Sequence, residues 1–112
     1  MSADFCIGSP SNIAQMGLWI YFLARVCGYK PGELVYVTGD THIYSNHIDG
    51  AKEVIHNAHL ISDINYPQLN LDSQIGKRDV AGSLEMVPKL NEGMFILEDY
   101  NPVGTIKFPL AV

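Results

Sequence analysis

Residues 13–27 constrain the fold of this 112-residue chain more than any other segment. Their sequence, Ile-Ala-Gln-Met-Gly-Leu-Trp-Ile-Tyr-Phe-Leu-Ala-Arg-Val-Cys, would place apolar side chains nearly all round a helix. That distribution is typical of a buried helix, because a surface helix keeps one polar face. The segment contains Gln15 and Arg25 and is too short to span a bilayer. We therefore expect a long buried helix inside a globular protein.

The ends of this helix are marked by typical residues. Ser11 is the expected start, and Asn12 with Gln15 three positions later fits a capping box. Gly28 follows Cys27 where a helix would end.

Other segments predict strands and one further helix. Runs rich in β-branched or aromatic residues indicate strands over 3–7, 33–44, 68–71 and 94–100, and helical spacing indicates a helix over 46–58. Residues 72–92 show weak periodicity and are expected to form an irregular connection with one helical turn. The pattern predicts an α+β fold in which a mixed sheet packs on the long buried helix.

Composition excludes several classes of function. Hydrophobic residues make up 47% of the chain, so we expect some apolar surface to contact another chain or a further segment. The net charge is −5 and the cations are scattered, which argues against nucleic-acid binding. Cys6 and Cys27 resemble small buried hydrophobes, and His56 and His59 lack a carboxylate or Cys at ligand spacing, so no metal is expected. No signal peptide opens the sequence, and a soluble cytoplasmic protein is predicted.

A polar segment follows the second predicted strand. Residues 39–47 read Gly-Asp-Thr-His-Ile-Tyr-Ser-Asn-His, and these polar groups either cap the next helix or contact a sugar or phosphate. In a strand, His42 and Tyr44 point to the same face and could meet one ligand.

Two further polar residues have alternative interpretations. Asn12 is either a helix cap or a base-reading amide, since its acceptor and paired donors can match the O4 and N3–H of uracil. The flipped amide would match cytosine instead, so neighbours must fix its orientation. Asp4 is either an exposed edge residue of a short strand or part of a site.

Taken together, three blocks of this sequence resemble thymidylate synthase. Residues 2–14 are similar to the family stretch Arg-Ser-x-Asp-x-x-Leu-Gly-x-Pro-Phe-Asn-Ile-Ala, and residues 39–47 match Gly-Asp-x-His-x-Tyr-x-Asn-His. The third block comprises Tyr-Asn-Pro at 100–102, Ile-Lys at 106–107 and Pro-Leu-Ala-Val at 109–112. The resemblance is strong over 2–58 and 94–112, whereas 60–93 forms a divergent connection. It implies that residues 1–112 are the C-terminal nucleotide-binding part of a thymidylate synthase-like domain.

The resemblance implies a role for each matched residue. Ser2 would help to hold the phosphate of dUMP, Asn12 would read the uracil edge, and His42 with Tyr44 would bind the 3′-hydroxyl of the deoxyribose. On the folate side, Asp4 would face the pterin of 5,10-methylenetetrahydrofolate. Ala111 and Val112 would close over the bound ligands. The family reaction is the reductive methylation of dUMP to dTMP, so the chain is expected to be enzyme-derived, and family members are homodimers.

Several departures from the family pattern bear on activity. The nucleophilic Cys of the family lies in a Pro-Cys-His motif expected upstream of Ser2, and residues 1–112 contain no such tripeptide. Met1 stands where the family has Arg, and the other phosphate-binding arginines are also missing from this chain. Cys6 occupies an apolar strand position and does not replace the nucleophile. We therefore expect no turnover by these 112 residues alone.

Other differences leave related functions open. Ser11 replaces a Phe, and Val-Gly-Thr at 103–105 replaces His-Pro-Gly in the tail. A nucleotide hydroxymethylase of the same superfamily, acting on dUMP or dCMP, is one alternative, although Asn12 favours uracil because cytosine-specific relatives are expected to carry Asp there. A non-catalytic remnant that binds nucleotide or only dimerises is the other.

Overall fold

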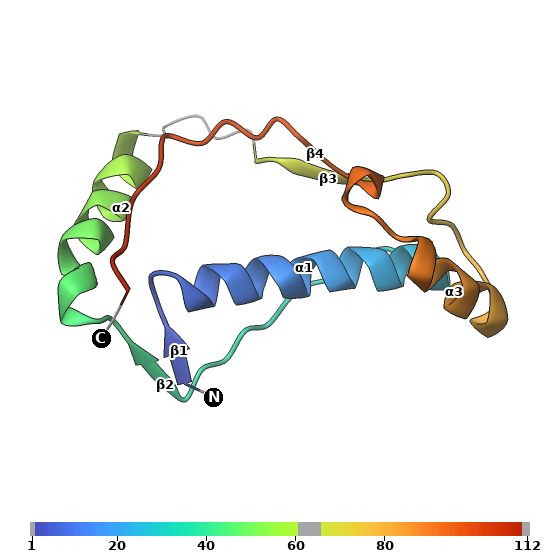
Figure 1. The fold of residues 1–112 in the computed structure, drawn as a ribbon, viewed down its shortest axis with the longest axis horizontal. Helices are drawn as coiled ribbons and strands as arrows, with labels where there is room; N and C mark the ends of the chain where they lie inside the picture. The colour runs from blue at the N-terminus through green and yellow to red at the C-terminus, as the bar shows by residue number, and fades with distance from the viewer. Residues whose placement is uncertain (1, 61–65, 111–112) are drawn as a thin grey trace. The chain divides into compact units, whose positions relative to one another are not determined.

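The computed structural model describes residues 2–60 and 66–110. Figure 1 shows its helices and strands in chain order. The chain divides into two compact units. The first unit comprises residues 1–14, 35–65 and 101–112, and the second comprises 15–34 and 66–100. Ala111 and Val112, which were predicted to close over ligands, lie outside the described residues.

The first unit contains two short parallel strands. Strand β1 (Ser2–Asp4) pairs with β2 (Asp40–His42), so that Ser2 lies opposite Asp40 and Asp4 opposite His42. A further hydrogen bond from the Phe5 amide to the His42 carbonyl, 2.9 Å long, extends the ladder by one residue. This pairing joins the first two motif blocks of the sequence.

Helix α1 (Gly8–Cys27) begins three residues before the predicted start and ends where predicted. Its C-terminal end is a Schellman motif, in which the Gly28 amide donates to the Arg25 carbonyl and the Tyr29 amide donates to the Ala24 carbonyl. Gly28 adopts a φ of 76°, which a side chain would disfavour. The expected capping box is wrong, because Asn12 lies within the helix rather than before it.

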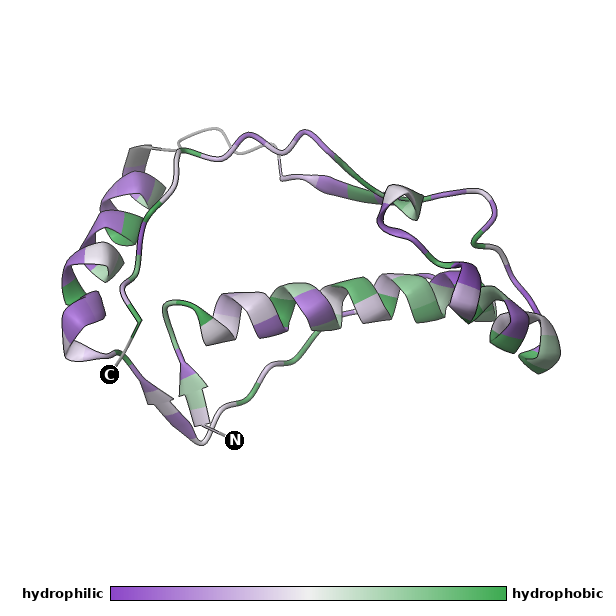
Figure 2. Cartoon of the chain, viewed as in Figure 1, coloured by the Kyte–Doolittle hydropathy of each residue, from purple (hydrophilic) through white to green (hydrophobic). Residues whose placement is uncertain are grey.

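The burial of α1 differs from the expectation of a helix buried on every side. Among its residues only Ser9, Phe22 and Val26 are buried, whereas Trp19 is 55% exposed. Figure 2 shows hydrophobic residues distributed along much of the helix. Within the described residues, only a narrow stripe of α1 is buried. The reason is that a short chain supplies too little apolar surface to cover a helix that is apolar all round.

The strand predicted over residues 33–44 is reduced to the three residues of β2. Residues 29–38 have no regular secondary structure, and Val35 and Val37 are 80% and 79% exposed. The propensity of β-branched residues for strands depends on packing against a neighbouring strand. Within residues 2–60 and 66–110, the strand that pairs with this segment is β1, which is itself three residues long.

Helix α2 (Ile48–Leu60) completes the first unit together with the segment 101–110. A turn of 3-10 helix (Ser45–His47) precedes it, and its bounds lie about two residues beyond the predicted ones. The segment 101–110 runs beside α2 (Figure 1), and the Phe108 ring packs against the bare Cα of Gly50.

The second unit holds an antiparallel pair of strands and a short helix. Strand β3 (Gln68–Leu71), as predicted, pairs with β4 (Phe95–Glu98), which is shorter than predicted. Helix α3 (Val80–Met86) and the 3-10 turns Val87–Lys89 and Glu92–Met94 make residues 72–92 more regular than expected.

The apolar core of the second unit forms on α1 and the connection that follows β3. Its buried members are Phe22, Val26, Ile75 and Met86, with Leu71, Leu90, Met94 and Phe95 packed around them. Arg25 of α1 donates a 2.7 Å hydrogen bond from its Nε to the carbonyl of Ile75, which lies in the connection after β3. The α+β class is confirmed, but the described strands form two separate two-stranded sheets instead of one mixed sheet. No helix in the described part of the chain is both long and apolar enough to cross a membrane.

Candidate functional site

The end of the β1–β2 pair brings the first two motif blocks together. Asp4 and His42 are partners in the strand register, and Asp40 lies 3.7 Å from His42, measured between the carboxylate Oδ1 and ring Nδ1. Ser2 is exposed at the other end of the pair, opposite Asp40. Parallel pairing fixes this arrangement because it aligns the carboxyl ends of both strands.

A row of aromatic rings leads from β2 to the C-terminal segment. His42 and Tyr44 meet edge to face with centroids 5.0 Å apart, as expected for side chains on one face. Tyr44 also contacts His47 at 5.4 Å, and His47 contacts Phe108 at 5.2 Å. Such edge-to-face contacts stabilise a specific mutual orientation of the rings.

His47 connects the second and third motif blocks. Its ring is almost completely buried, with 1% of the residue exposed, and its Nε2 lies 2.7 Å from the Pro109 carbonyl. The neighbouring Asn46 donates from Nδ2 to the Leu110 carbonyl at 3.4 Å. His47 was not among the residues predicted to bind a ligand, although its position at the end of a polar motif before a helix was a usable signal.

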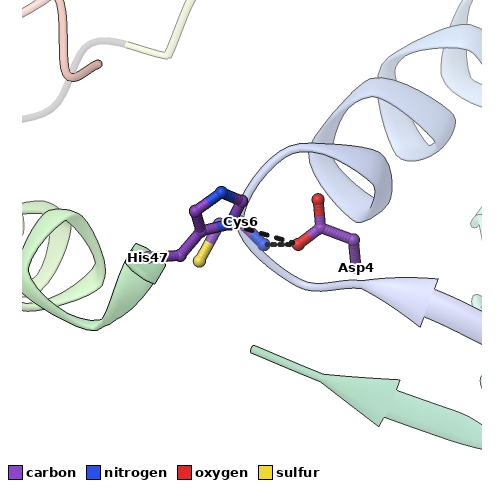
Figure 3. Close-up of side chains that lie close together, drawn as sticks. All are labelled: Asp4, Cys6 and His47. Atoms are coloured by element: carbon purple, nitrogen blue, oxygen red, sulfur yellow. Dashed lines mark hydrogen bonds and ion pairs between the residues drawn. The ribbon is translucent and has the colours of Figure 1, made fainter. Parts of the chain in front are cut away.

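Asp4 contacts the turn that follows β1, and it is half-buried rather than exposed at an edge (Figure 3). Its Oδ1 accepts a hydrogen bond from the Cys6 amide at 3.1 Å and lies 3.9 Å from His47 Nδ1. Partial burial, together with the charge of Asp4, raises the pKa of the Cys6 thiol above its ordinary value. A thiol in this environment is a weak nucleophile near neutral pH, because little of it is thiolate.

The ligand atoms of Asp4, Cys6 and His47 all lie within 4.8 Å of one another. A carboxylate oxygen, a sulfur and an imidazole nitrogen are the three donor types that transition metals bind in proteins. Both cysteines were predicted to be small buried hydrophobes, but Cys6 is only half-buried and Cys27 is exposed.

Asn12 lies in the second turn of α1 and is half-buried. Its side-chain amide makes no hydrogen bond to another described residue. The expected pairing of Asn12 with a base therefore stays a prediction. So do the roles of Ser2, Asp4, His42 and Tyr44, since the geometry shows their placement and not their ligand.

The chain is an α+β protein, and the described residues of its three motif blocks, apart from Tyr100, lie in one compact unit. A family model described as thymidylate synthase matches residues 1–112, the whole of the sequence. The chain therefore belongs to the thymidylate synthase family.

Curated relatives agree with this assignment. The chain is 33% identical over 111 residues to the thymidylate synthase of Ascaris suum, covering 99% of this chain and 33% of that protein. It is also 33% identical over 111 residues to the thymidylate synthase of Homo sapiens, again covering 99% of this chain but 31% of the relative. A bifunctional dihydrofolate reductase-thymidylate synthase of Paramecium tetraurelia is 52% identical over 54 residues, which are 48% of this chain and 12% of that protein. The chain thus spans about a third of the length of the Ascaris and human proteins.

Proposed function

We propose that this chain supplies the C-terminal, nucleotide-binding part of a thymidylate synthase that converts dUMP to dTMP with 5,10-methylenetetrahydrofolate. The pairing of Asp4 with His42 is the observation that carries the proposal. It joins the block that would read the base and the pterin to the block that would bind the sugar. Family membership over the whole chain supports the same conclusion.

The nucleotide would be held by side chains of the first unit. Ser2 would contact the phosphate, while His42 and Tyr44 would donate to or accept from the 3′-hydroxyl of the deoxyribose. The His42 and Tyr44 rings are in edge-to-face contact, with centroids 5.0 Å apart. This proximity supports a shared ligand, because the imidazole nitrogens and the phenol hydroxyl could reach the same small group. Asn12 would pair with the uracil edge through its side-chain amide.

The folate would be bound next to the nucleotide. Asp4 would face the pterin, and its fixed hydrogen bond to the Cys6 amide supports this role because it orients the carboxylate. Ala111 and Val112 would close over both ligands. The contacts of Asn46 and His47 with residues 109–110 support this, since they hold the segment that precedes the terminus.

The chemistry requires a thiolate that adds to C6 of dUMP and makes C5 nucleophilic towards the methylene carbon of the folate. Hydride transfer from the folate then gives dTMP and dihydrofolate. The family's Pro-Cys-His tripeptide does not occur among the 112 residues. Cys6 is a poor candidate because its pKa is raised. We therefore propose that these residues turn over dUMP only together with a part that carries the nucleophile.

A second copy or a complementing N-terminal part would cover the exposed apolar side chains of α1. Met16, Trp19 and Leu23 are 47%, 55% and 50% exposed, which supports a surface that is paired in the working enzyme. The predicted homodimer and the cytoplasmic location belong to this proposal.

Two alternatives differ from the synthase in a measurable way. A hydroxymethylase would complete the reaction with water and give a hydroxymethyl nucleotide. For such a hydroxymethylase, Asn12 would favour a uracil nucleotide over a cytosine nucleotide as substrate. A remnant that binds nucleotide or only dimerises would form no product at all.

The test is a chimeric synthase in which this chain replaces the matching C-terminal part of the human relative, leaving the upstream Pro-Cys-His in place. We expect dTMP from dUMP, identified by mass. Cys6→Ser should keep this activity, whereas Asn12→Asp should shift the preference from dUMP towards dCMP. A hydroxymethyl product would favour the first alternative. A folded chimera that forms no product, or an Asn12→Asp variant with unchanged base preference, would contradict the assignment.

A further inference from the structure

Three potential metal ligands lie together at the end of β1. Asp4 ends the strand, Cys6 lies in the turn after it, and His47 ends the 3-10 turn before α2 (Figure 3). All three belong to the first compact unit. Each offers one ligand atom, and the three atoms lie within 4.8 Å of one another.

The tautomer of His47 follows from its contact with Pro109. The Pro109 carbonyl can only accept a hydrogen bond, so the ring nitrogen Nε2, at 2.7 Å, carries the proton. In the neutral ring, Nδ1 is then a lone-pair acceptor. This atom is buried and has no hydrogen-bond partner among the described residues. An unpaired acceptor in a buried position destabilises the folded protein.

The group that faces Nδ1 is another acceptor. Asp4 Oδ1 lies 3.9 Å from it, which is too long for a hydrogen bond. The same oxygen accepts from the Cys6 amide at 3.1 Å, which fixes the carboxylate in this direction. Two lone-pair atoms aimed at one space are stabilised by a cation between them, and the Cys6 sulfur borders the same space.

We propose that Asp4, Cys6 and His47 form a binding site for a zinc-type divalent cation. Sulfur and imidazole nitrogen favour Zn²⁺ over Mg²⁺ and Ca²⁺, which take oxygen ligands. A histidine that binds zinc usually donates its other N–H to a backbone carbonyl or a carboxylate, as His47 does to Pro109. Three protein ligands leave one position of a tetrahedral ion for water.

The ligand atoms, which lie within 4.8 Å of one another, must come closer together to bind one ion. Typical zinc bond lengths place tetrahedral ligand atoms about 3.3–3.6 Å apart. The separation of 3.9 Å between Nδ1 and Oδ1 therefore contracts by roughly half an ångström on binding. Binding replaces the thiol proton of Cys6 by the metal and releases that proton to solvent, so no oxidant or reductant takes part. The site shares Asp4 with the proposed pterin contact, and the titrations below contain neither nucleotide nor folate, so their outcome is separate from that of the proposed function.

The experiment titrates the chelator-treated 112-residue chain with Zn²⁺ alone by calorimetry and with Co²⁺ alone by absorption spectroscopy. We expect one Zn²⁺ per chain and, with Co²⁺, a thiolate-to-metal charge-transfer band together with the intense visible bands of a tetrahedral ion. The Co²⁺ spectrum requires no substitution and so does not depend on the folding of a variant.

Matched variants identify the ligands. Cys6→Ser and Asp4→Asn keep the size of each side chain, and each should weaken Zn²⁺ binding by about tenfold or more. Cys6→Ser should also remove the charge-transfer band. Cys27→Ser changes the exposed second cysteine, and His56→Gln changes an exposed histidine of α2, so neither should alter the affinity.

Three results would overturn the site. One is an affinity for Zn²⁺ that is the same in the Cys6→Ser variant as in the unchanged chain. Another is a charge-transfer band that disappears with Cys27→Ser instead. The third is loss of binding in His56→Gln, which would place the metal on α2 between His56 and His59.

Discussion

Substitution of Gly50 by alanine sets two opposing effects against each other. Gly50 is the third residue of α2, where alanine favours the helix by roughly 0.5–1 kcal/mol. However, a Cβ at this position would lie 2.5 Å from Cε1 of Phe108 and 3.0 and 3.1 Å from Cδ1 and Cζ. Carbon atoms in good contact lie about 3.5–4.0 Å apart, so the ring would have to move by about 1 Å.

The clash outweighs the gain in helix propensity. Phe108 also packs edge to face against the His47 ring, with centroids 5.2 Å apart, and the next residue, Pro109, accepts the His47 hydrogen bond. Overpacking of this kind costs about 1–3 kcal/mol. Subtracting the propensity gain leaves a destabilisation of roughly 0–2.5 kcal/mol for Gly50→Ala, with a central value of about 1 kcal/mol.

Amide hydrogen exchange of α2 measures this effect, because a two-unit chain need not unfold in a single step. Gly17→Ala is the matched control, since Gly17 lies within α1 and a Cβ there meets no atom within 4 Å. It should stabilise α1 by roughly 0.5–1 kcal/mol. In a Phe108→Ala background Gly50→Ala should become neutral or stabilising. Equal destabilisation by Gly50→Ala with and without the Phe108 ring would refute the reasoning.

Three further substitutions test the second unit. Ile75→Ala, at a residue with 0% exposure, should destabilise this unit by about 2–5 kcal/mol, measured by denaturant unfolding followed through Trp19 fluorescence. An unchanged midpoint would mean that Ile75 is not in the core. The Asp79 carboxylate caps α3 by accepting a 2.8 Å hydrogen bond from the Gly82 amide. Asp79→Ala removes this cap and should lower the stability of α3, measured by amide hydrogen exchange, by about 1 kcal/mol. Asp79→Asn should retain most of that stability. Gly28→Ala should lower stability by roughly 1 kcal/mol because φ is 76° there, and a variant as stable as the parent in thermal unfolding would contradict this strain.

Local sequence patterns predicted those elements whose stability is local. The end of α1 at Gly28 was predicted because only glycine adopts this φ readily, and strand β3 was predicted with its observed bounds. The long strand expected over 33–44 failed because strand formation needs a partner, and β1 pairs with only three of those residues. The start of α1 was placed too late because Asn12 resembled a cap.

Some features of the candidate site were likewise predicted from the sequence, and others were seen only in the structure. Period-two spacing predicted that His42 and Tyr44 share a face, and their rings are 5.0 Å apart. The resemblance of the motif blocks predicted the family, which the comparisons show. The proximity of His47 to Asp4 and Cys6 could not be predicted from residue spacing, because these residues are far apart in the sequence.

By itself, the sequence determined the α+β class, the family and the residue types placed in each motif block, because these depend on local propensity and residue identity. Only the tertiary structure decided that His47 is buried between Asp4 and Pro109. It also decided that much of the apolar surface of α1 is exposed in the described chain. The physical reason is that side-chain proximity and burial depend on which strands pair and which segments pack. Both are set by contacts between residues far apart in sequence.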